Sequence, residues 1–442
     1  MPKLINQLLS LPQKLGYVSP PQAGTSSPKL DLLTCLALAL FPLLYLTLRG
    51  WTNYFVFILL IMAIIHLVTT TRVNRTDDCP IATWAISLTL ASPILAIFFS
   101  QLFRGEFTST AFDGPSRFLL AAPVFLYLKN RSFNFTKIIE WTIPISLIIC
   151  LGAYVFNPAA SEQWDGRAAS YFVDTITFGV YCLILGFICL ASIKINDEKE
   201  SAFLTTLKLF GLAIGFYIAI QSQSRSAWTA ALGLLVALSF MKLHKKHPLA
   251  PWVMVALGIL AMVSAYLLIP SVQMRIGTAI KEVIEYTQGG ALDTSTGIRI
   301  SMMRIGIHLI IESPLAGFKD GVMPALNSIP SIQPFYSEEL QFVTTEAGVH
   351  TEILAQGVRS GIFGLISSTA LFVVPGFLFW KRLNHQNSQI RAAALIGFVL
   401  VLGLFIAALT IQVYNLKYTS SFYALMIAAL SAQVLQDKKK HV

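Results

Sequence analysis

Twelve long apolar runs set the strongest limit on what this chain can fold into. A helix needs roughly 17–25 mostly apolar residues to cross a bilayer. The runs that meet or approach this length are 30–48, 51–70, 82–100, 116–128, 138–156, 172–193, 204–221, 226–241, 251–269, 361–380, 392–410 and 419–436. Their uniform apolarity differs from the alternating strands of an outer-membrane barrel. The sequence therefore predicts an all-α polytopic membrane protein with about 12 transmembrane helices.

The composition agrees with a membrane protein and narrows its chemistry. Only 12% of the 442 residues are charged, about half the fraction of a soluble domain. The five cysteines have neither disulfide nor zinc spacing, and we expect them to act as small apolar side chains. No P-loop, dinucleotide fingerprint or nucleophile elbow is present, so we expect no cofactor and no metal.

The distribution of Lys and Arg predicts the orientation. With the N-terminus in the cytoplasm, the cytoplasmic segments carry nineteen of these residues. The short outer segments carry six, namely Arg49, Arg104, Arg117, Arg167, Arg225 and Lys417. This bias follows the positive-inside rule, and it explains most of the net charge of +10 without a nucleic-acid partner. Both termini are then cytoplasmic.

The interval 270–361 is the one long polar break between apolar runs. It reads as an outer loop with short helices, one over Ser271–Gln288 and a second that ends at Glu312 before Ser313 and Pro314. The predicted organisation is a cytoplasmic N-terminal segment 1–29, transmembrane helices 1–9 over 30–269, a periplasmic loop 270–360, transmembrane helices 10–12 over 361–436, and a basic tail 437–442.

Arginines in outer segments need an explanation other than topology. Arg225 stands in Gln-Ser-Gln-Ser-Arg-Ser-Ala-Trp at 221–228, between two apolar runs. A cation among hydroxyls and amides at the membrane surface indicates an anion site. The structural alternative is an arginine that snorkels beside an interfacial tryptophan. Arg167, which follows Gly166 in another outer segment, is a further candidate for the same surface.

Arg299 lies at the expected start of the second loop helix. Thr294, Ser295 or Thr296 can cap this helix and leave free backbone N–H groups at its positive end. A guanidinium beside such an end suits phosphate binding. The alternative is an amphipathic helix with solvated arginines, which is what we expect for Arg304.

His350 stands where the outer loop re-enters the membrane. If a helix begins near residue 349, then His350, Leu354, Gly357 and Gly361 share one face. A lone histidine is usually structural, and we expect this of the other six. The place of re-entry makes His350 a candidate catalytic group.

Four motifs, in this order, make the chain resemble the O-antigen ligase and O-antigen polymerase superfamily of bacterial envelope biosynthesis. They are Gly166-Arg167, Ser-Arg-Ser-Ala-Trp at 224–228, Ser295-x-Gly297-x-Arg299 running to Glu-Ser-Pro-Leu-x-Gly at 312–317, and His350-x-x-x-Leu354 ending in Gly-Ile-Phe-Gly at 361–364. The sequence departs from the family at Thr351, where Asn is frequent, and it lacks the usual Pro-Asn after the Gly-Arg pair.

The resemblance implies a GT-C-like glycosyltransferase in the bacterial inner membrane with a periplasmic active site. A glycan would pass from undecaprenyl diphosphate to a sugar hydroxyl, which for a ligase belongs to the lipid A–core of lipopolysaccharide. Arg225 and Arg299, with Arg167, would bind the diphosphate and stabilise its developing charge. His350 would accept the proton of the acceptor hydroxyl. The reaction would invert the anomeric carbon and need no metal.

Other functions remain open from the sequence. A polymerase would use the same donor with a second lipid-linked glycan as acceptor, and a protein O-glycosyltransferase of the superfamily would use a protein. A flippase or transporter belongs to a different class. Such transporters often show paired repeats and broken spans near the midplane, and the sequence shows no internal repeat. This favours an enzyme.

The topology predicts opposite locations for two fusion reporters. A reporter at Gly290 should be active on the periplasmic side, and one at Val442 on the cytoplasmic side. Activity of both reporters on the same side would contradict the number of spans.

Overall fold

The computed structural model describes residues 28–69, 79–131, 133–194, 200–243, 248–290, 293–318 and 326–436. These residues contain helices and no strand, so the predicted all-α class is confirmed. Residues 1–27 of the predicted N-terminal segment and the predicted tail 437–442 lie outside the described residues.

The α-helices of the described residues are α2 (Pro28–Leu40), α3 (Trp51–Thr69), α4 (Pro80–Arg104), α5 (Asp113–Lys129), α6 (Phe135–Phe156), α7 (Pro158–Glu162), α8 (Thr175–Ser192), α9 (Ala202–Gln221), α10 (Arg225–Leu243), α11 (Ala250–Leu268), α12 (Pro270–Thr287), α13 (Ser295–Glu312), α14 (Glu338–Ala347), α15 (Glu352–Arg382), α16 (Ser388–Ala408) and α17 (Lys417–Val434). Short 3₁₀ helices are η1 (Ser109–Phe112), η2 (Leu326–Ser328) and η3 (Gln333–Phe335).

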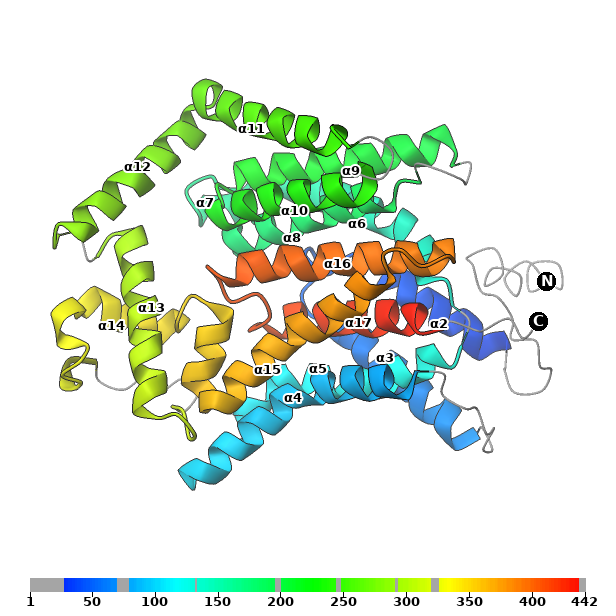
Figure 1. The fold of residues 1–442 in the computed structure, drawn as a ribbon, viewed down its shortest axis with the longest axis horizontal. Helices are drawn as coiled ribbons and strands as arrows, with labels where there is room; N and C mark the ends of the chain where they lie inside the picture. Colours follow the sequence, from blue (N-terminus) through cyan, green and yellow to red (C-terminus); the bar gives the residue numbers. More distant parts are fainter. Residues whose placement is uncertain are drawn as a thin grey trace.

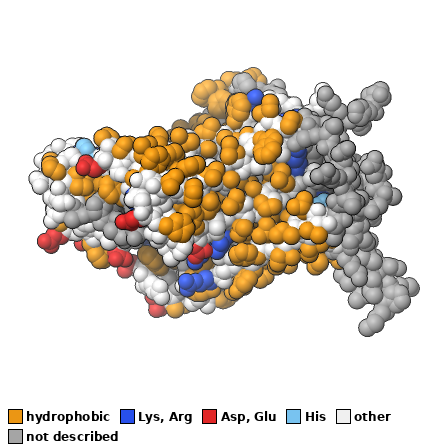
Figure 2. Space-filling view, turned by 90° about the horizontal axis from the view of Figure 1, so that it is seen from below, with side chains coloured by type: hydrophobic (Ala, Val, Ile, Leu, Met, Phe, Trp, Pro, Cys, Tyr) orange, Lys and Arg blue, Asp and Glu red, His pale blue; other side chains and the backbone are white. Residues whose placement is uncertain are grey.

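Among the described residues, eight helices are long and apolar enough to cross a membrane, namely α3, α4, α6, α8, α9, α11, α15 and α16. The other four predicted spans coincide with α2, α5, α10 and α17, which pack in the same bundle. Hydrophobic side chains cover much of the middle of the face shown in Figure 2. These features are those of a multi-pass membrane protein.

The first predicted span, 30–48, is helical only as far as Leu40. Residues 41–50 form turns instead. Pro42 explains the change, because proline lacks a backbone N–H and disfavours a helical conformation at the residue before it. Phe41 and Tyr45 in this turn segment are fully buried, and Tyr45 stacks on Phe422 of α17 with ring centroids 4.0 Å apart.

Helices α8 and α17 form the centre of the bundle. Of the 18 residues of α8, 89% are buried inside the protein. In α17, every residue from Tyr418 to Val434 is buried. The sequence of α17 is rich in Ser and Ala, and such small residues let helices approach closely in a membrane. By contrast, only 6% of the residues in the apolar stretch of α11 are buried. Helix α11 therefore lies at the periphery (Figure 1).

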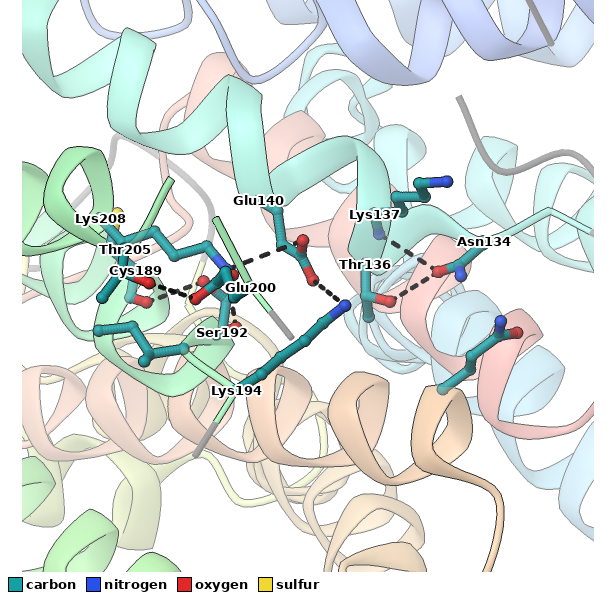
Figure 3. Close-up of polar contacts among 12 residues, drawn as sticks. Asn134, Thr136, Lys137, Glu140, Cys189, Ser192, Lys194, Glu200, Thr205 and Lys208 are labelled. Carbon is teal, nitrogen blue, oxygen red and sulfur yellow. Dashed lines mark hydrogen bonds and ion pairs between the residues drawn. The ribbon is translucent and has the colours of Figure 1, made fainter. Parts of the chain in front are cut away.

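A network of buried charges joins α6, α8 and α9 at one end of the bundle (Figure 3). Lys208 is fully buried and donates to the carbonyl oxygen of Ser192 at 2.9 Å. Its ammonium also pairs with Glu200, and with Glu140 at 3.7 Å. Because removing one partner would leave an uncompensated buried charge, this network fastens the three helices together.

Helices α12, α13 and α14 lie together at the opposite end (Figure 1), which we call the loop side. The ends predicted for the first two loop helices agree with α12 and α13. Thr294 caps α13 by accepting a hydrogen bond from the backbone N–H of Gly297 at 3.1 Å. A separate apolar core holds this region together, formed by Met302, Ile305, Leu309, Leu326, Ile332, Leu340, Val349 and Val358. The polar interval is therefore folded, with a core of its own.

Helix α15 is interrupted at Ser360 and Gly361, where the backbone leaves the helical region. Residues 314–318 fill this break: Ile362 N–H donates to the Pro314 carbonyl oxygen, and Phe318 N–H donates to that of Val358, both at 2.7 Å. Gly361 has a φ of +59°, and a Cβ there would collide with the Pro314 carbonyl. The Glu-Ser-Pro-Leu-x-Gly motif thus holds the end of the outer loop by backbone contacts.

This break corrects one prediction about His350. The helix begins at Glu352, and His350 lies in a bend before it. Because Gly361 lies in the break, His350, Leu354, Gly357 and Gly361 do not share a helical face. The reason is that the backbone hydrogen bonds of residues 358 and 362 go to the 314–318 segment.

Gly361→Ala should destabilise the protein by more than about 1–2 kcal/mol, the cost of a left-handed conformation for an L-residue. The collision with Pro314 adds to this cost. The matched control is Gly277→Ala in α12, where a Cβ meets nothing within 4 Å. Thermal unfolding of the purified proteins should show a lower Tm for the first variant only. Equal Tm values would mean that the contact with Pro314 is not rigid.

Candidate functional site

Four arginines from separate segments lie near one another on the loop side, and we call them the arginine cluster. They are Arg167 before α8, Arg225 at the start of α10, Arg275 on α12 and Arg299 on α13. Arg299 interacts electrostatically with Arg225 and Arg275, and Arg167 with Arg275 and Arg299. The structure therefore brings together all three arginines singled out in the sequence, and it adds a fourth.

Arg225 is tied to the N-terminus of α13. Its Nη1 donates to Thr296 Oγ1 at 3.0 Å, and its Nη2 donates to Ser295 Oγ at 3.2 Å. Glu282 of α12 lies 3.9 Å from Nη1 and accepts a hydrogen bond from the backbone N–H of Thr296 at 3.0 Å. The helix that carries Arg299 is thus oriented by the side chain of Arg225.

Arg167 holds the turn that precedes α10. Its Nε and Nη2 donate to the carbonyl oxygen of Ser222 at 3.0 and 2.8 Å. The next turn residue, Gln223, has a φ of +51°, an uncommon conformation for a residue with a side chain. Burial and the nearby positive charge of Arg275 lower the pKa of Arg167 to about 10. The side chain stays protonated near neutral pH.

Within the arginine cluster, Arg299 and Arg275 have unused hydrogen-bonding groups. Within the described part of the chain, the Arg299 guanidinium has no hydrogen bond or ion pair, and the buried Nε of Arg275 has no partner. Burial and the charges of Arg225 and Arg275 lower the pKa of Arg299. Half-buried cations close to one another are unfavourable unless an anion compensates them.

Sequence reasoning missed Arg275, although a signal exists. Val272, Glu282 and Tyr286 form the buried stripe of α12. Arg275 follows Val272 by three residues, so it lies on that stripe and not on the solvated face. An arginine on the buried stripe of an amphipathic helix is a candidate ligand-binding residue, and the same argument identifies Glu282.

His350 borders the arginine cluster. It is half-buried, and burial together with the charge of Arg299 lowers the pKa of His350, while the charge of Asp174 acts in the opposite direction. Asp174 also caps α8, because its Oδ1 accepts hydrogen bonds from the backbone N–H groups of Ile176 and Thr177. Because its pKa is lowered, the imidazole of His350 is neutral near neutral pH.

A buried carboxylate positions the His350 segment. Glu352 is fully buried, and its Oε2 accepts hydrogen bonds from the backbone N–H groups of Val413 and Tyr414 at 2.8 and 3.2 Å. Gln412 donates to the carbonyl oxygen of Val349 at 2.9 Å. The residues on both sides of His350 are thus bound to the α16–α17 connection. The motif comparison in the sequence did not identify Glu352.

The remaining polar groups of the loop have simpler roles. Arg304 is exposed, and its guanidinium lies over the Tyr286 ring, 5.3 Å from the centroid. Within the described residues, no group of three or more His, Cys, Asp or Glu side chains is placed to hold a metal ion. The chemistry of the site is that of fixed positive charge, the N-terminus of α13 and one neutral imidazole.

The chain is similar to known proteins over the region that contains this site. Residues 210–368 match a family model described as O-antigen ligase. An uncharacterised protein of Haemophilus influenzae is 22% identical over 298 residues, which are 65% of this chain and 70% of that protein. A protein of Escherichia coli K12 named O-antigen ligase is 23% identical over 263 residues, 59% of this chain and 60% of that protein. The resemblance to the O-antigen ligase superfamily is thereby confirmed.

Conservative substitutions in the arginine cluster should impair glycan transfer. Arg225→Lys and Arg299→Lys keep the charge but lose the planar two-pronged donor, and Arg275→Lys should behave in the same way. The expected loss reaches about 10²–10³-fold, the usual scale for removing one donor that stabilises developing charge. Transfer would be measured in membranes with matched expression. The control is Arg304→Lys, which should retain normal activity. Normal transfer by all three variants would mean that the arginine cluster does not contribute to transfer.

Proposed function

We propose that this chain is an O-antigen ligase that transfers a glycan from undecaprenyl diphosphate to the lipid A–core of lipopolysaccharide at the periplasmic face of the inner membrane. The observation that carries the proposal is the convergence of four arginines, from separate segments, beside a half-buried histidine. The family match supports a glycosyltransferase-like activity.

The donor diphosphate would lie among Arg225, Arg275 and Arg299, close to the N-terminus of α13. The unused groups of Arg275 and Arg299 supply donors, and the N-terminus of α13 supplies the positive end of its dipole. The N–H groups of Thr296 and Gly297 are already bonded to Glu282 and Thr294. Arg167 donates two N–H groups to the carbonyl oxygen of Ser222. It therefore contributes positive charge and holds the turn before Arg225. This arrangement stabilises the negative charge that develops on the leaving diphosphate.

His350 would act as the general base. Its neutral imidazole accepts the proton of the acceptor hydroxyl while that oxygen forms a bond to the anomeric carbon. The bond between this carbon and the phosphate oxygen breaks, and its electron pair leaves with undecaprenyl diphosphate. Attack from the side opposite the leaving group inverts the anomeric carbon. Burial and the positive charge of Arg299 lower the pKa of His350 and so favour its neutral form before the reaction.

The acceptor distinguishes this proposal from polymerisation. A polymerase would use the same arginines for the donor but a second lipid-linked glycan as acceptor. The match to the O-antigen ligase family model and the similarity to the Escherichia coli O-antigen ligase support the ligase. The lipopolysaccharide profile of a deletion strain separates the two functions. A ligase defect removes long-chain material from the core and leaves lipid-linked polymer, whereas a polymerase defect leaves single repeat units on the core.

His350→Ala should leave donor binding nearly unchanged and lower transfer by about 10²–10⁴-fold, the usual contribution of general acid–base catalysis. Transfer would be measured with purified protein whose Tm matches the wild type. A folded variant with a normal rate would exclude the role as base. Loss of folding would instead indicate a structural role.

The pH profile offers an independent test of the same residue. Protonation of His350 removes the base, so kcat/KM should fall as the pH decreases through its lowered pKa. Because Asp174 raises that pKa, Asp174→Asn should move the acid limb to lower pH. Asn also serves as an N-cap, so α8 should keep its start. An unchanged acid limb would mean that another group controls it.

A further inference from the structure

Glu282 of α12 places a negative charge inside the arginine cluster. Its Oε2 lies 3.9 Å from Arg225 Nη1, and its charge also acts on Arg299. Only 11% of the Glu282 side chain is exposed, so the carboxylate is held in a partly desolvated place. The donor site proposed above therefore contains an anion of the protein itself before any donor enters.

The carboxylate of Glu282 has the contacts that a phosphate group uses. Its Oε2 accepts hydrogen bonds from the backbone N–H of Thr296 at 3.0 Å, in the first turn of α13, and from the hydroxyl of the same residue. That hydroxyl in turn accepts a hydrogen bond from Arg225 Nη1 at 3.0 Å. A backbone N–H at a helix start, a hydroxyl and a guanidinium are the usual donors to a bound phosphate. Glu282 thus occupies an anion position at the start of α13.

Other contacts hold α12 and Arg225 in place if the carboxylate moves away. The hydroxyl of Tyr286 on α12 lies 3.1 Å from that of Ser301 on α13, within hydrogen-bonding distance. Arg225 has a second bond, from Nη2 to Ser295 Oγ at 3.2 Å. The two helices can therefore stay together while Glu282 leaves its partners.

The local charges favour exchange of Glu282 for an anion of higher charge. One carboxylate acts on two guanidinium groups, those of Arg225 and Arg299, and the positive charge of Arg275 acts on the same two groups. A diphosphate has two phosphate groups and carries more negative charge than a carboxylate. It can take the place of Glu282 and reach the neighbouring arginines at the same time.

We infer that Glu282 is a displaceable counter-ion whose place one phosphate group of the donor takes. On binding, Arg225 and the N–H of Thr296 exchange the carboxylate for phosphate oxygens. After transfer, Glu282 returns to these groups and competes with undecaprenyl diphosphate, so it weakens the binding of this product and promotes its release. The inference rests on the proposed function, because it takes the arginine cluster to be the diphosphate site.

Binding of undecaprenyl diphosphate to the purified full-length protein tests this role. Affinity would be measured by calorimetry in detergent, for proteins whose Tm matches the wild type. Glu282→Gln removes the charge but keeps an oxygen that can accept from Thr296. The matched control is Glu285→Gln, the same change on the same helix, because the Glu285 side chain is 41% exposed and pairs with Lys281 at 3.6 Å.

Glu282→Gln should bind undecaprenyl diphosphate about tenfold more tightly than the wild type. Tenfold corresponds to about 1.4 kcal/mol, close to the net contribution of one hydrogen bond to a charged group. Glu282→Asp keeps the charge on a shorter side chain that reaches Thr296 less well, so it should also bind more tightly, by a smaller factor. Glu285→Gln should match the wild type.

Steady-state kinetics should show the same competition. In Glu282→Gln, the inhibition constant of undecaprenyl diphosphate and the KM of the lipid-linked donor should both fall, because the carboxylate competes with both ligands. A carboxylate that only stabilises the fold would leave these values unchanged or raise them.

Arg299→Gln separates a failure of this inference from a failure of the donor site, because loss of that guanidinium should weaken binding. Weaker binding by Arg299→Gln, without tighter binding by Glu282→Gln and Glu282→Asp, would overturn the inference and leave the proposed donor site intact. Unchanged binding by all three variants would contradict the donor site and this inference with it.

Discussion

Repulsion among half-buried arginines is the constraint on which the loop side depends. Guanidinium groups on four separate segments are held near one another with Glu282 as the close carboxylate. Like charges in a partly desolvated place oppose folding unless other interactions compensate them. Three interactions provide this compensation. Thr294 caps α13, Arg167 donates to the carbonyl oxygen of Ser222, and α13 contributes residues to the apolar core of the loop side. An anion bound among these guanidinium groups would relieve the remaining repulsion.

The charged side chains at the two ends of the bundle are paired differently. At one end, Lys208 pairs with Glu140 and Glu200, and Lys194 lies 3.9 Å from Glu140, so these charges are compensated within the protein (Figure 3). At the loop side, the cations have unused donors. The backbone contact between Pro314 and the break in α15 joins the loop to the membrane helices. The residues on both sides of His350 are bound separately to the α16–α17 connection, through Gln412 and Glu352.

Much of the fold was predictable from the chain because hydrophobic length is a local property. Eleven of the twelve apolar runs coincide with helices, and the first is helical as far as Leu40. The ends of α12 and α13 agree with their Pro, Gly-Gly and Glu-Ser-Pro signals. Two predicted helices were wrong in extent, and both errors have local causes that the apolar pattern does not show. Pro42 ends α2 early, and the glycine at 361 marks a break where a continuous helix was predicted.

The sequence by itself determined that this is a helical membrane protein, and it identified Arg167, Arg225, Arg299 and His350 as polar residues in places that topology does not explain. Only the tertiary structure decided that these residues meet, because they lie on segments separated by up to 183 positions (167 to 350). It also decided that Arg275 and Glu282 join them and that Glu352 holds the histidine segment. Electrostatic partnership depends on distance in space, and a single sequence contains no measure of that distance.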